Sequence, residues 1–210
     1  GGITNPSGAG TQTGTITSQT SAPATIDSLG VAMDVTTATG DEVVVTATVP
    51  ATFNFALSAN SLALGTLSTG SITSGNVTVD IDSNAGNGWV AFIRGSGSAV
   101  LSSASTGDSI SSTATGSPVT VAAGAKGYVV DVAGSQGGSS GGTLSIATEY
   151  DGNGTSTGGV IATTYEQIAQ STGVALNDTL TLTALVTISA VTEAASDYTN
   201  TWDVVGAANF

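Results

Sequence analysis

Oxygen-bearing side chains alternate along one glycine-rich segment of the chain. The run EYDGNGTST places Glu149, Asp151 and Asn153 at every second position, and Thr155 continues the series. Hard cations such as Ca²⁺ prefer oxygen ligands of these kinds. The spacing does not match an EF-hand, whose loop needs a glycine at its sixth position and a glutamate at its twelfth. The segment is therefore a candidate calcium site, with a plain solvated turn as the alternative.

A second acidic group follows a predicted strand. Asp80, Asp82 and Asn84 alternate, so their side chains would share one face of that strand. A calcium ion would neutralise this face, whereas acidic residues on the solvent side of a strand are usually just hydrated. A calcium-dependent shift in melting temperature would identify an ion at either place. Calcium is the one cofactor that the sequence suggests.

Most combinations of catalytic residues are incomplete in this chain. It contains no cysteine and no histidine, which removes thiolate nucleophiles, the commonest general base and the HExxH zinc motif of metalloproteases. Paired carboxylates can hydrolyse glycosidic bonds, but no glutamate-centred strand motif marks such a pair. We therefore expect no catalytic residues and no enzymatic activity.

Positive charge is nearly absent. Arg94 and Lys126 are the basic residues against 15 acidic ones, and the formal net charge is −13. Nucleic acids and anionic membrane surfaces would be repelled, and no apolar run is long enough to span a bilayer. Lys126 invites comparison with lysines that form isopeptide bonds to Asn or Asp in surface sandwiches. An exposed lysine is the alternative.

Aromatic residues and sequons suggest contacts with sugars. Trp89 and Trp202, with three tyrosines, could stack on a glycan, although large aromatics on strands more often fill a core. The tyrosines are Tyr128, Tyr165 and Tyr198. Three sequons fit N-glycosylation, and in a threonine-rich chain they can also arise by chance. Their asparagines are Asn76, Asn153 and Asn177.

Period-two alternation, typical of half-buried strands, recurs along the chain. The clearest case is TLTLTALVTIS, where one face carries Leu180, Leu182, Ala184, Val186 and Ile188. Further cases are Leu29/Val31/Met33/Val35, Val43/Val45/Ala47/Val49, Val77/Val79/Ile81, Trp89/Ala91/Ile93, Tyr128/Val130/Val132 and Tyr198/Asn200/Trp202/Val204. So many apolar faces require two packed sheets. We predict an all-β, jelly-roll-like two-sheet sandwich.

One segment departs from this pattern. In TTYEQIAQST (163–172), helix-forming residues follow a candidate N-cap in Thr163 or Thr164. Three apolar residues there have helical spacing, namely Tyr165, Ile168 and Ala169. We predict one short helix that closes an open end of the sandwich.

The start of the chain differs from the rest. Residues 1–21 are rich in Gly, Thr and Ser, with Ile3 and Ile16 as large apolar side chains, and Pro23 separates them from the first convincing strand. We therefore divide the chain into an N-terminal extension (1–21) and a sandwich domain (22–210). The extension is either a frayed terminus or a segment that donates a strand to a partner.

The arrangement VVVTATVPATFNFALSANSLALGTLSTGSITSGNVTVDIDSNAGNGWVAF, with a terminal TISAVTEAASDYTNTWDVV pair, resembles surface β-sandwich proteins of uncultivated bacterial lineages and the TasA/camelysin group of matrix-fibre subunits. The resemblance implies a secreted jelly roll whose N-terminal segment adds as a strand to the neighbouring subunit, giving a head-to-tail homopolymer. Ile16 would be the main donor anchor and Ile3 the second, with Thr11, Thr13, Thr15 and Thr17 around them.

We therefore expect a structural subunit of an extracellular filament or surface layer, such as a biofilm matrix. Its partner would be further copies of itself, and a signal peptide would already have been removed. The alternative is a carbohydrate-binding or adhesive cell-surface module, whose partners would be glycans. Electron micrographs of the purified protein would separate fibres from dispersed particles that bind glycans.

Overall fold

The computed structural model describes residues 8–35, 43–112 and 117–210. The chain divides into two compact units, Gly1–Val49 and Pro50–Phe210. None of the described residues is helical, and every described pair of neighbouring strands is antiparallel. In that part of the chain, no helix is long and apolar enough to cross a lipid bilayer.

The N-terminal unit contains a β-hairpin. Strand β1 (Gly10–Gln19) pairs along its length with β2 (Thr25–Val35), and the turn is closed by a bond from the Thr20 N–H to the Ala24 carbonyl at 2.9 Å. Both strands belong to the unit Gly1–Val49. Their pairing therefore spans residue 21, where the sequence analysis divided the chain.

One face of this hairpin is apolar and exposed. Ile16 lies opposite Leu29, Gly14 opposite Val31, and Gln12 opposite Met33, so these side chains share a face. Ile16, Leu29, Val31 and Met33 are all exposed. An isolated two-stranded hairpin is at best marginally stable in water, so this face has a physical reason to acquire a partner.

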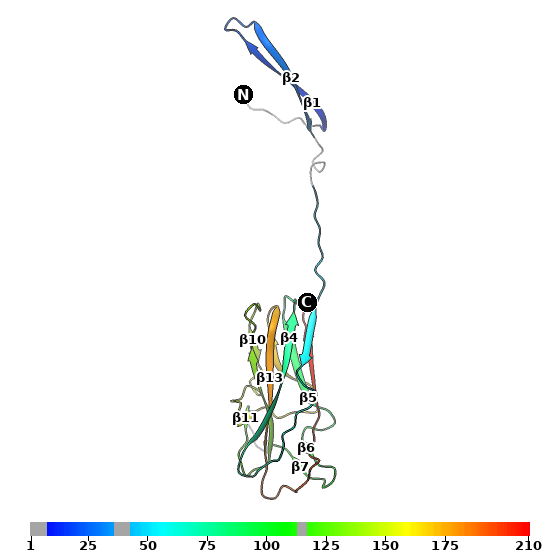
Figure 1. Ribbon diagram of the computed structural model, residues 1–210, viewed down its shortest axis with the longest axis vertical. Helices are drawn as coiled ribbons and strands as arrows, with labels where there is room; N and C mark the ends of the chain where they lie inside the picture. Colours follow the sequence, from blue (N-terminus) through cyan, green and yellow to red (C-terminus); the bar gives the residue numbers. More distant parts are fainter. Residues whose placement is uncertain (1–7, 36–42, 113–116) are drawn as a thin grey trace. The chain divides into compact units, whose positions relative to one another are not determined.

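The second unit is built from two four-stranded sheets (Figure 1). The first has the order β3 (Phe53–Leu57), β4 (Thr73–Ser83), β13 (Ala175–Thr187), β9 (Gly127–Ser135). The second has the order β10 (Leu144–Ile146), β12 (Glu166–Ser171), β5 (Trp89–Gly95), β14 (Trp202–Ala208). Two short pairs complete the unit: β6 (Leu101–Ser102) with β7 (Ser109–Ile110), and β8 (Val119–Thr120) with β11 (Thr157–Gly158).

The two sheets share one hydrophobic core. Inward residues of β4 and β13, such as Val79 and Leu182, are buried in the same cluster as Trp89 and Ile93 of β5. The predicted alternation is confirmed in β4, β5 and most of β13, whereas β9 is buried on both faces from Gly127 to Val132. The fold is all-β and sandwich-like. Side chains that alternate between core and solvent explain why these strands were readable in the sequence.

The predicted helix over 163–172 is wrong, because Glu166–Ser171 forms strand β12, between β5 and β10. The register with β5 shifts between Gln167 and Ala169, which makes Ile168 an extra residue in a β-bulge. The bulge buries the adjacent residues Ile168 and Ala169 together. Two neighbouring buried residues break the period of two, and this break gave the segment its helical appearance.

Two other predicted strands form only in part or not at all. Strand β14 begins at Trp202, and before it only Thr199 makes a bridge, to Ser102. The segment Val43–Val49 forms no strand in the described structure, although every second residue in it is apolar. Val43, Val45 and Val49 are 88%, 86% and 81% exposed. The segment therefore has the sequence pattern of a buried strand but pairs with no strand in the described part of the chain.

Candidate functional site

The two long sides of the sandwich differ in how their sheet edges are covered. Along β9, Val130 exchanges two backbone hydrogen bonds of 2.8 Å with Gly159, and the Val132 N–H donates to the Tyr150 carbonyl at 2.9 Å. On the opposite side, β3 and β14 are the edge strands of their sheets. Unpaired sheet edges accept strands from other chains, so this side is the place to look for an interaction site.

Strand β3 is too short to cover its neighbour. It pairs only with Val79–Ser83 of β4, and beyond it two hydrogen bonds join Ser58 to Thr78. The N-terminal half of β4, Thr73–Val77, therefore has no strand beside it on this side within the described chain. The irregular segment 59–66 lies against this half of the strand, because Leu62 and Leu64 pack over Gly75.

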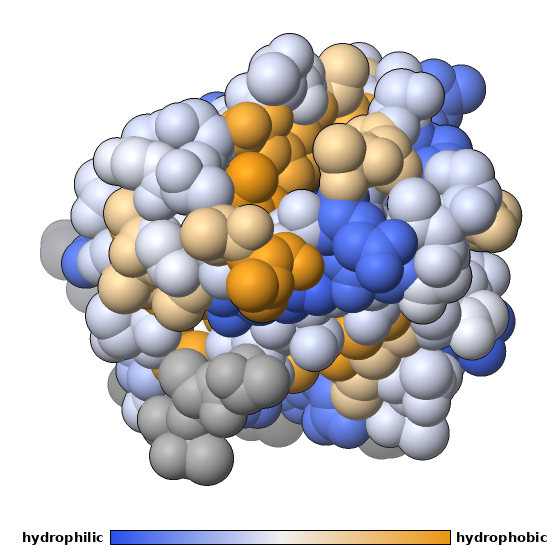
Figure 2. All heavy atoms as spheres, turned by 90° about the horizontal axis from the view of Figure 1, so that it is seen from below, coloured by the Kyte–Doolittle hydropathy of each residue, from blue (hydrophilic) through white to orange (hydrophobic). Residues whose placement is uncertain are grey.

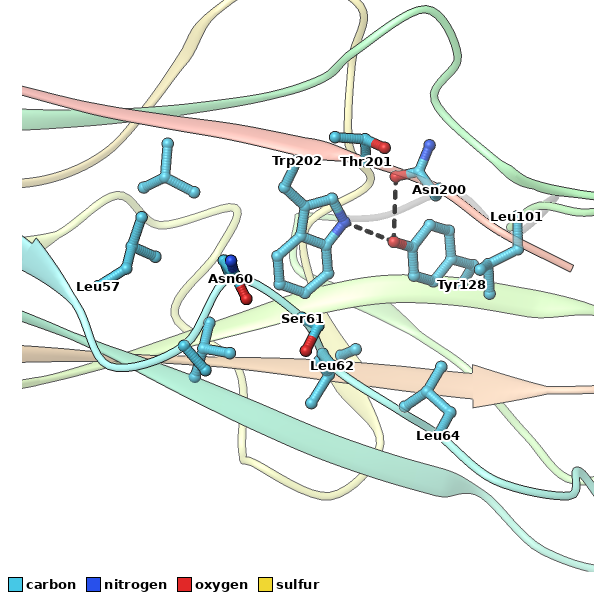
Figure 3. Close-up of a pocket in the computed structure, with 14 residues that line it drawn as sticks. Leu57, Asn60, Ser61, Leu62, Leu64, Leu101, Tyr128, Asn200, Thr201 and Trp202 are labelled. Atoms are coloured by element: carbon cyan, nitrogen blue, oxygen red, sulfur yellow. Dashed lines mark hydrogen bonds between the residues drawn. The ribbon is translucent and has the colours of Figure 1, made fainter.

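An apolar cavity of about 300 Å³ opens between this segment and β14. Its walls are shown in Figure 3 and include Leu57, Leu62, Leu64, Leu101, Trp202 and Val204. A second cavity, of about 640 Å³, shares Leu62, Leu64 and Leu101 and continues to Ile110 and Ile188. We call the two together the edge groove. Figure 2, a view of the end that carries β6 and β7, shows hydrophobic residues at the surface among more polar ones.

Three polar groups on the β14 side of the groove are joined by hydrogen bonds. The Trp202 indole N–H donates to the Tyr128 hydroxyl, which donates to Asn200 Oδ1 at 3.2 Å (Figure 3). Asn200 Nδ2 donates to the Ser98 carbonyl at 2.8 Å. Burial raises the pKa of Tyr128 above its usual value, so the phenol stays neutral. This wall of the groove therefore offers mainly apolar contact rather than free charge.

Beyond the groove the sandwich is closed by one close contact. Phe55 of β3 packs its ring directly against Gly206 of β14, where a Cβ atom would overlap the ring. No side chain other than hydrogen fits at Gly206 without moving Phe55. The contact defines one end of the open part of the sandwich edge.

The five aromatic residues singled out in the sequence do not form one platform. Trp89 is fully buried in the core, whereas Trp202 and Tyr128 line the groove. Tyr165 lies under Arg94, whose guanidinium carbon is 4.6 Å from the ring centroid and which pairs with Asp203 at 2.8 Å. Tyr165 is 44% exposed but lies outside the groove, so Trp202 and Tyr128 are the aromatic rings that a ligand in the groove would meet.

Lys126 forms an ion pair. Its Nζ donates to Asp108 Oδ1 and, at 3.0 Å, to the Ser109 carbonyl. Asp108 Oδ2 also accepts from the Tyr198 hydroxyl at 2.8 Å and the Glu193 N–H at 3.1 Å. The hydrogen bond from Lys126, followed by those from Glu193 and Tyr198, lowers the pKa of Asp108 well below its usual value. An ionised carboxylate is a poor acyl donor to an amine, so the geometry favours an ion pair over an isopeptide bond.

The glycine-rich acidic segment is a structured turn. Asn153 Oδ1 accepts hydrogen bonds from the N–H groups of Thr155 (3.0 Å), Ser156 (2.8 Å) and Thr157 (3.1 Å). Glu149 and Asp151 are exposed. Across the described residues, no three acidic, His or Cys side chains come together as a metal site. The amide oxygen that would have been a ligand is therefore already used by the backbone.

The second acidic group is engaged by protein donors. Asp80 Oδ1 accepts from the Thr179 hydroxyl at 3.2 Å, and Asp82 Oδ1 accepts from the Asn177 N–H at 2.8 Å. These bonds link β4 to β13. The two carboxylates thus have structural partners, and the predicted calcium ligands are not brought together with a third acidic residue.

Asn84, the third member of that group, holds the segment through which the chain reaches β3. Its Oδ1 accepts from the Thr52 N–H at 2.8 Å, and its Nδ2 donates to the Pro50 carbonyl at 2.8 Å. The Asn84 N–H also donates to the Thr52 carbonyl at 3.3 Å. These three bonds keep Pro50–Thr52 beside the β4–β5 connection, and we call them the Asn84 clamp.

All three sequon asparagines are exposed: Asn76, Asn153 and Asn177. Asn153 Nδ2 donates to the Ser156 hydroxyl at 3.1 Å, so a glycan there would have to replace this bond. Asn177 has a φ of 58°, a left-handed conformation that asparagine tolerates better than most residues.

The predicted donor residues lie in the hairpin. Thr11, Thr13, Thr15, Ile16 and Thr17 all belong to β1 and are paired with β2, and Ile16 is on the exposed apolar face. Ile3 lies outside the described residues. The sequence analysis did not include the groove residues Leu62 and Leu64, although their alternation in SLALGTL was a signal that could have found them.

The chain was also compared with known proteins. No family model, curated protein or solved structure shows significant similarity to it.

Proposed function

We propose that this chain is a structural subunit of an extracellular filament or surface layer, which polymerises when its N-terminal segment adds as a strand to a neighbouring copy. The observation that carries the proposal is that two parts of the chain each expose a surface suited to pairing with a strand. The sandwich has an open sheet edge beside an apolar groove, and the N-terminal unit exposes apolar strand residues. Strand addition would satisfy both, through main-chain hydrogen bonds at the edge and side chains in the groove.

The geometry of such an assembly gives a filament. The donating and accepting surfaces are different parts of the chain, so each copy can both give and receive. A heterologous contact of this kind generates an open helical polymer unless its rotation closes into a ring. The same hypothesis has two further parts. We propose that the strands of the sandwich are connected as in a jelly roll, and that the chain has no catalytic role.

Composition supports a role outside the cell. Only 8% of the residues are charged, so hydroxyl groups rather than ion pairs solvate the surface. The strand rhythm that resembles the TasA/camelysin group points in the same direction. We therefore propose that the chain is secreted and acts in a matrix or surface layer.

A carbohydrate-binding or adhesive module is the second candidate, favoured by one observation. The Trp202 ring lies beside the amide and hydroxyl side chains of Asn60, Ser61 and Asn200 in the groove (Figure 3). An aromatic face next to such groups is a suitable surface for a sugar ring. In this alternative the groove binds a glycan instead of a strand.

Electron microscopy and sedimentation of the purified full chain test the proposal, with a charged variant in the groove. Leu57→Arg would place a cation at the groove, and Leu176→Arg is the control, because the two leucines are similarly exposed, at 45% and 49%. We expect fibres from the wild type and from Leu176→Arg and none from Leu57→Arg. Fibres from Leu57→Arg would show that the groove is not part of the contact between subunits. Dispersed wild-type particles that bind glycans would favour the adhesive module.

A further inference from the structure

We infer that the strand added to the neighbouring copy is Val43–Val49, and this rests on the proposed function. The segment is exposed along its whole length and has no strand partner in the described part of the chain. Val43, Val45, Ala47 and Val49 would lie on one face of a strand, and Val44, Thr46 and Thr48 on the other. Six of these seven residues are β-branched, the side chains that strands favour.

This segment is better suited to insertion than β1. One edge of β1 is already bonded to β2 through its whole length, so residues 10–19 can join another sheet only as part of a two-stranded hairpin. Val43–Val49 lies outside any described strand, and a donor strand needs free backbone groups to pair with an open sheet edge. It also carries no charged side chain, so its burial would not desolvate a charge.

We assign the accepting groove to a second copy, because within one chain Val43–Val49 leads directly into Pro50–Thr52, which the Asn84 clamp holds. To pair with the β14 edge of its own sandwich, the segment would have to turn back at Pro50–Thr52. The Asn84 clamp already uses the polar backbone groups of Pro50 and Thr52. Val49 precedes a proline, which disfavours the helical conformation at that residue. The groove also starts at Leu57, the far end of β3, roughly 14 Å along the strand from Phe53.

The free edge of β14 matches the donor in length and pattern. β14 has 7 residues, Trp202–Ala208, and Val43–Val49 is equally long. Trp202 and Val204 line the groove, while Val205 is exposed on the opposite face. Suppose that the segment is added to this edge with Val43, Val45, Ala47 and Val49 facing the groove leucines. Val44, Thr46 and Thr48 would then lie on the same side of the sheet as Val205.

A pair of charge variants in the full chain tests which face of the donor strand points into the groove. Val45→Asp puts a carboxylate on the apolar face of the segment, and Thr46→Asp puts the same charge on the opposite face. We expect Val45→Asp to abolish fibres and Thr46→Asp to retain them, with both melting temperatures equal to that of the wild type, since both residues are exposed. Fibres from Val45→Asp would overturn the assignment of the donor while leaving the filament intact. A wild-type chain without fibres would overturn the filament itself.

Disulfide trapping in the full chain tests the pairing directly, because the chain contains no cysteine of its own. Val205→Cys is combined in turn with Val44→Cys, Thr46→Cys and Thr48→Cys. The control uses Val160→Cys instead, whose exposure of 42% is close to the 39% of Val205. We expect a ladder of covalent oligomers from at least one Val205 pair and none from the Val160 pairs. Equal ladders from both sets, or none from any Val205 pair in wild-type-like fibres, would overturn the pairing with β14.

Discussion

Trp89 and Asp178 join the two sheets through a hydrogen bond inside the core. The Trp89 indole N–H of β5 donates to Asp178 Oδ2 of β13 at 3.2 Å, and both residues are fully buried. Asp178 Oδ1 accepts from the Gly137 N–H at 2.9 Å and the Ser140 hydroxyl at 2.6 Å. The buried carboxylate is thus satisfied by three donors from different parts of the chain.

Replacing Asp178 by alanine should destabilise the protein by about 3 kcal/mol, because the buried Trp89 N–H and the part-buried donors of Gly137 and Ser140 would lose their acceptor together. Urea unfolding followed by tryptophan fluorescence would measure the loss. Asp80→Ala is the control, since Asp80 is exposed and makes one hydrogen bond to Thr179; we expect a change within about 0.5 kcal/mol. Equal unfolding midpoints for the two variants would contradict this role of Asp178.

Gly206→Ala should destabilise the sandwich by about 1–3 kcal/mol, because the added methyl group would overlap the Phe55 ring. Gly138→Ala is the matched control, as a Cβ there meets no atom within 4 Å. Thermal melting of both variants measures the difference. Phe55→Leu should recover part of the loss in the double variant, and no recovery would show that the strain lies elsewhere.

Acid should remove stability that depends on Asp197. The Ser103 hydroxyl, at 2.5 Å, and the Ser105 N–H, at 2.9 Å, bond its carboxylate and lower its pKa from 3.8 to about 2. A carboxyl group with a depressed pKa in the folded state stabilises the fold above pH 4, and this contribution is lost as the pH falls toward 2. The melting temperature of Asp197→Asn should therefore change less over this range than that of the wild type. Parallel curves for the two proteins would refute the assignment.

Asp131 should have the opposite pH dependence. Burial raises the pKa of its carboxyl group, and the N–H groups of Gly152 and Gly154 offset only part of that effect. The folded state therefore favours the protonated form, and the group costs stability as the pH rises above about 4. Asp131→Asn should melt at a higher temperature than the wild type at pH 7 and at a similar one at pH 3. A lower melting temperature at pH 7 would show that the ionised carboxylate has a favourable partner.

The strands that could be predicted are those with one face in the core and one in solvent. Val79 and Ile81 in β4, like Leu180 and Leu182 in β13, are fully buried between more exposed residues. Strand β12 could not be predicted because the bulge at Ile168 interrupts its period. Val43–Val49 has the pattern of a strand but forms none in the described structure. Alternation shows which face of a segment is apolar, but it does not show which strand the segment pairs with.

The groove could be predicted only in fragments. Trp202 and Tyr128 were noticed as aromatic residues, and Leu62 and Leu64 alternate visibly in the sequence. Their meeting depends on β14 and β3 lying at edges of different sheets, which no local pattern reveals. Asn84 was grouped with two aspartates as a calcium ligand, because an asparagine that binds ions and one that bonds Pro50 and Thr52 look alike in sequence.

The Asn84 clamp also determines how the sandwich would carry mechanical load. A pull on Val49 reaches the domain through Pro50–Thr52, which Asn84 anchors on either side of Ala51. The tension then enters β3, which is hydrogen-bonded to β4 from Phe53 to Leu57. Force directed along β3 would shear these bonds together rather than open them one at a time. The same short strand that leaves the groove uncovered would then resist extension as a unit, with Asn84 sharing the load at its first residues.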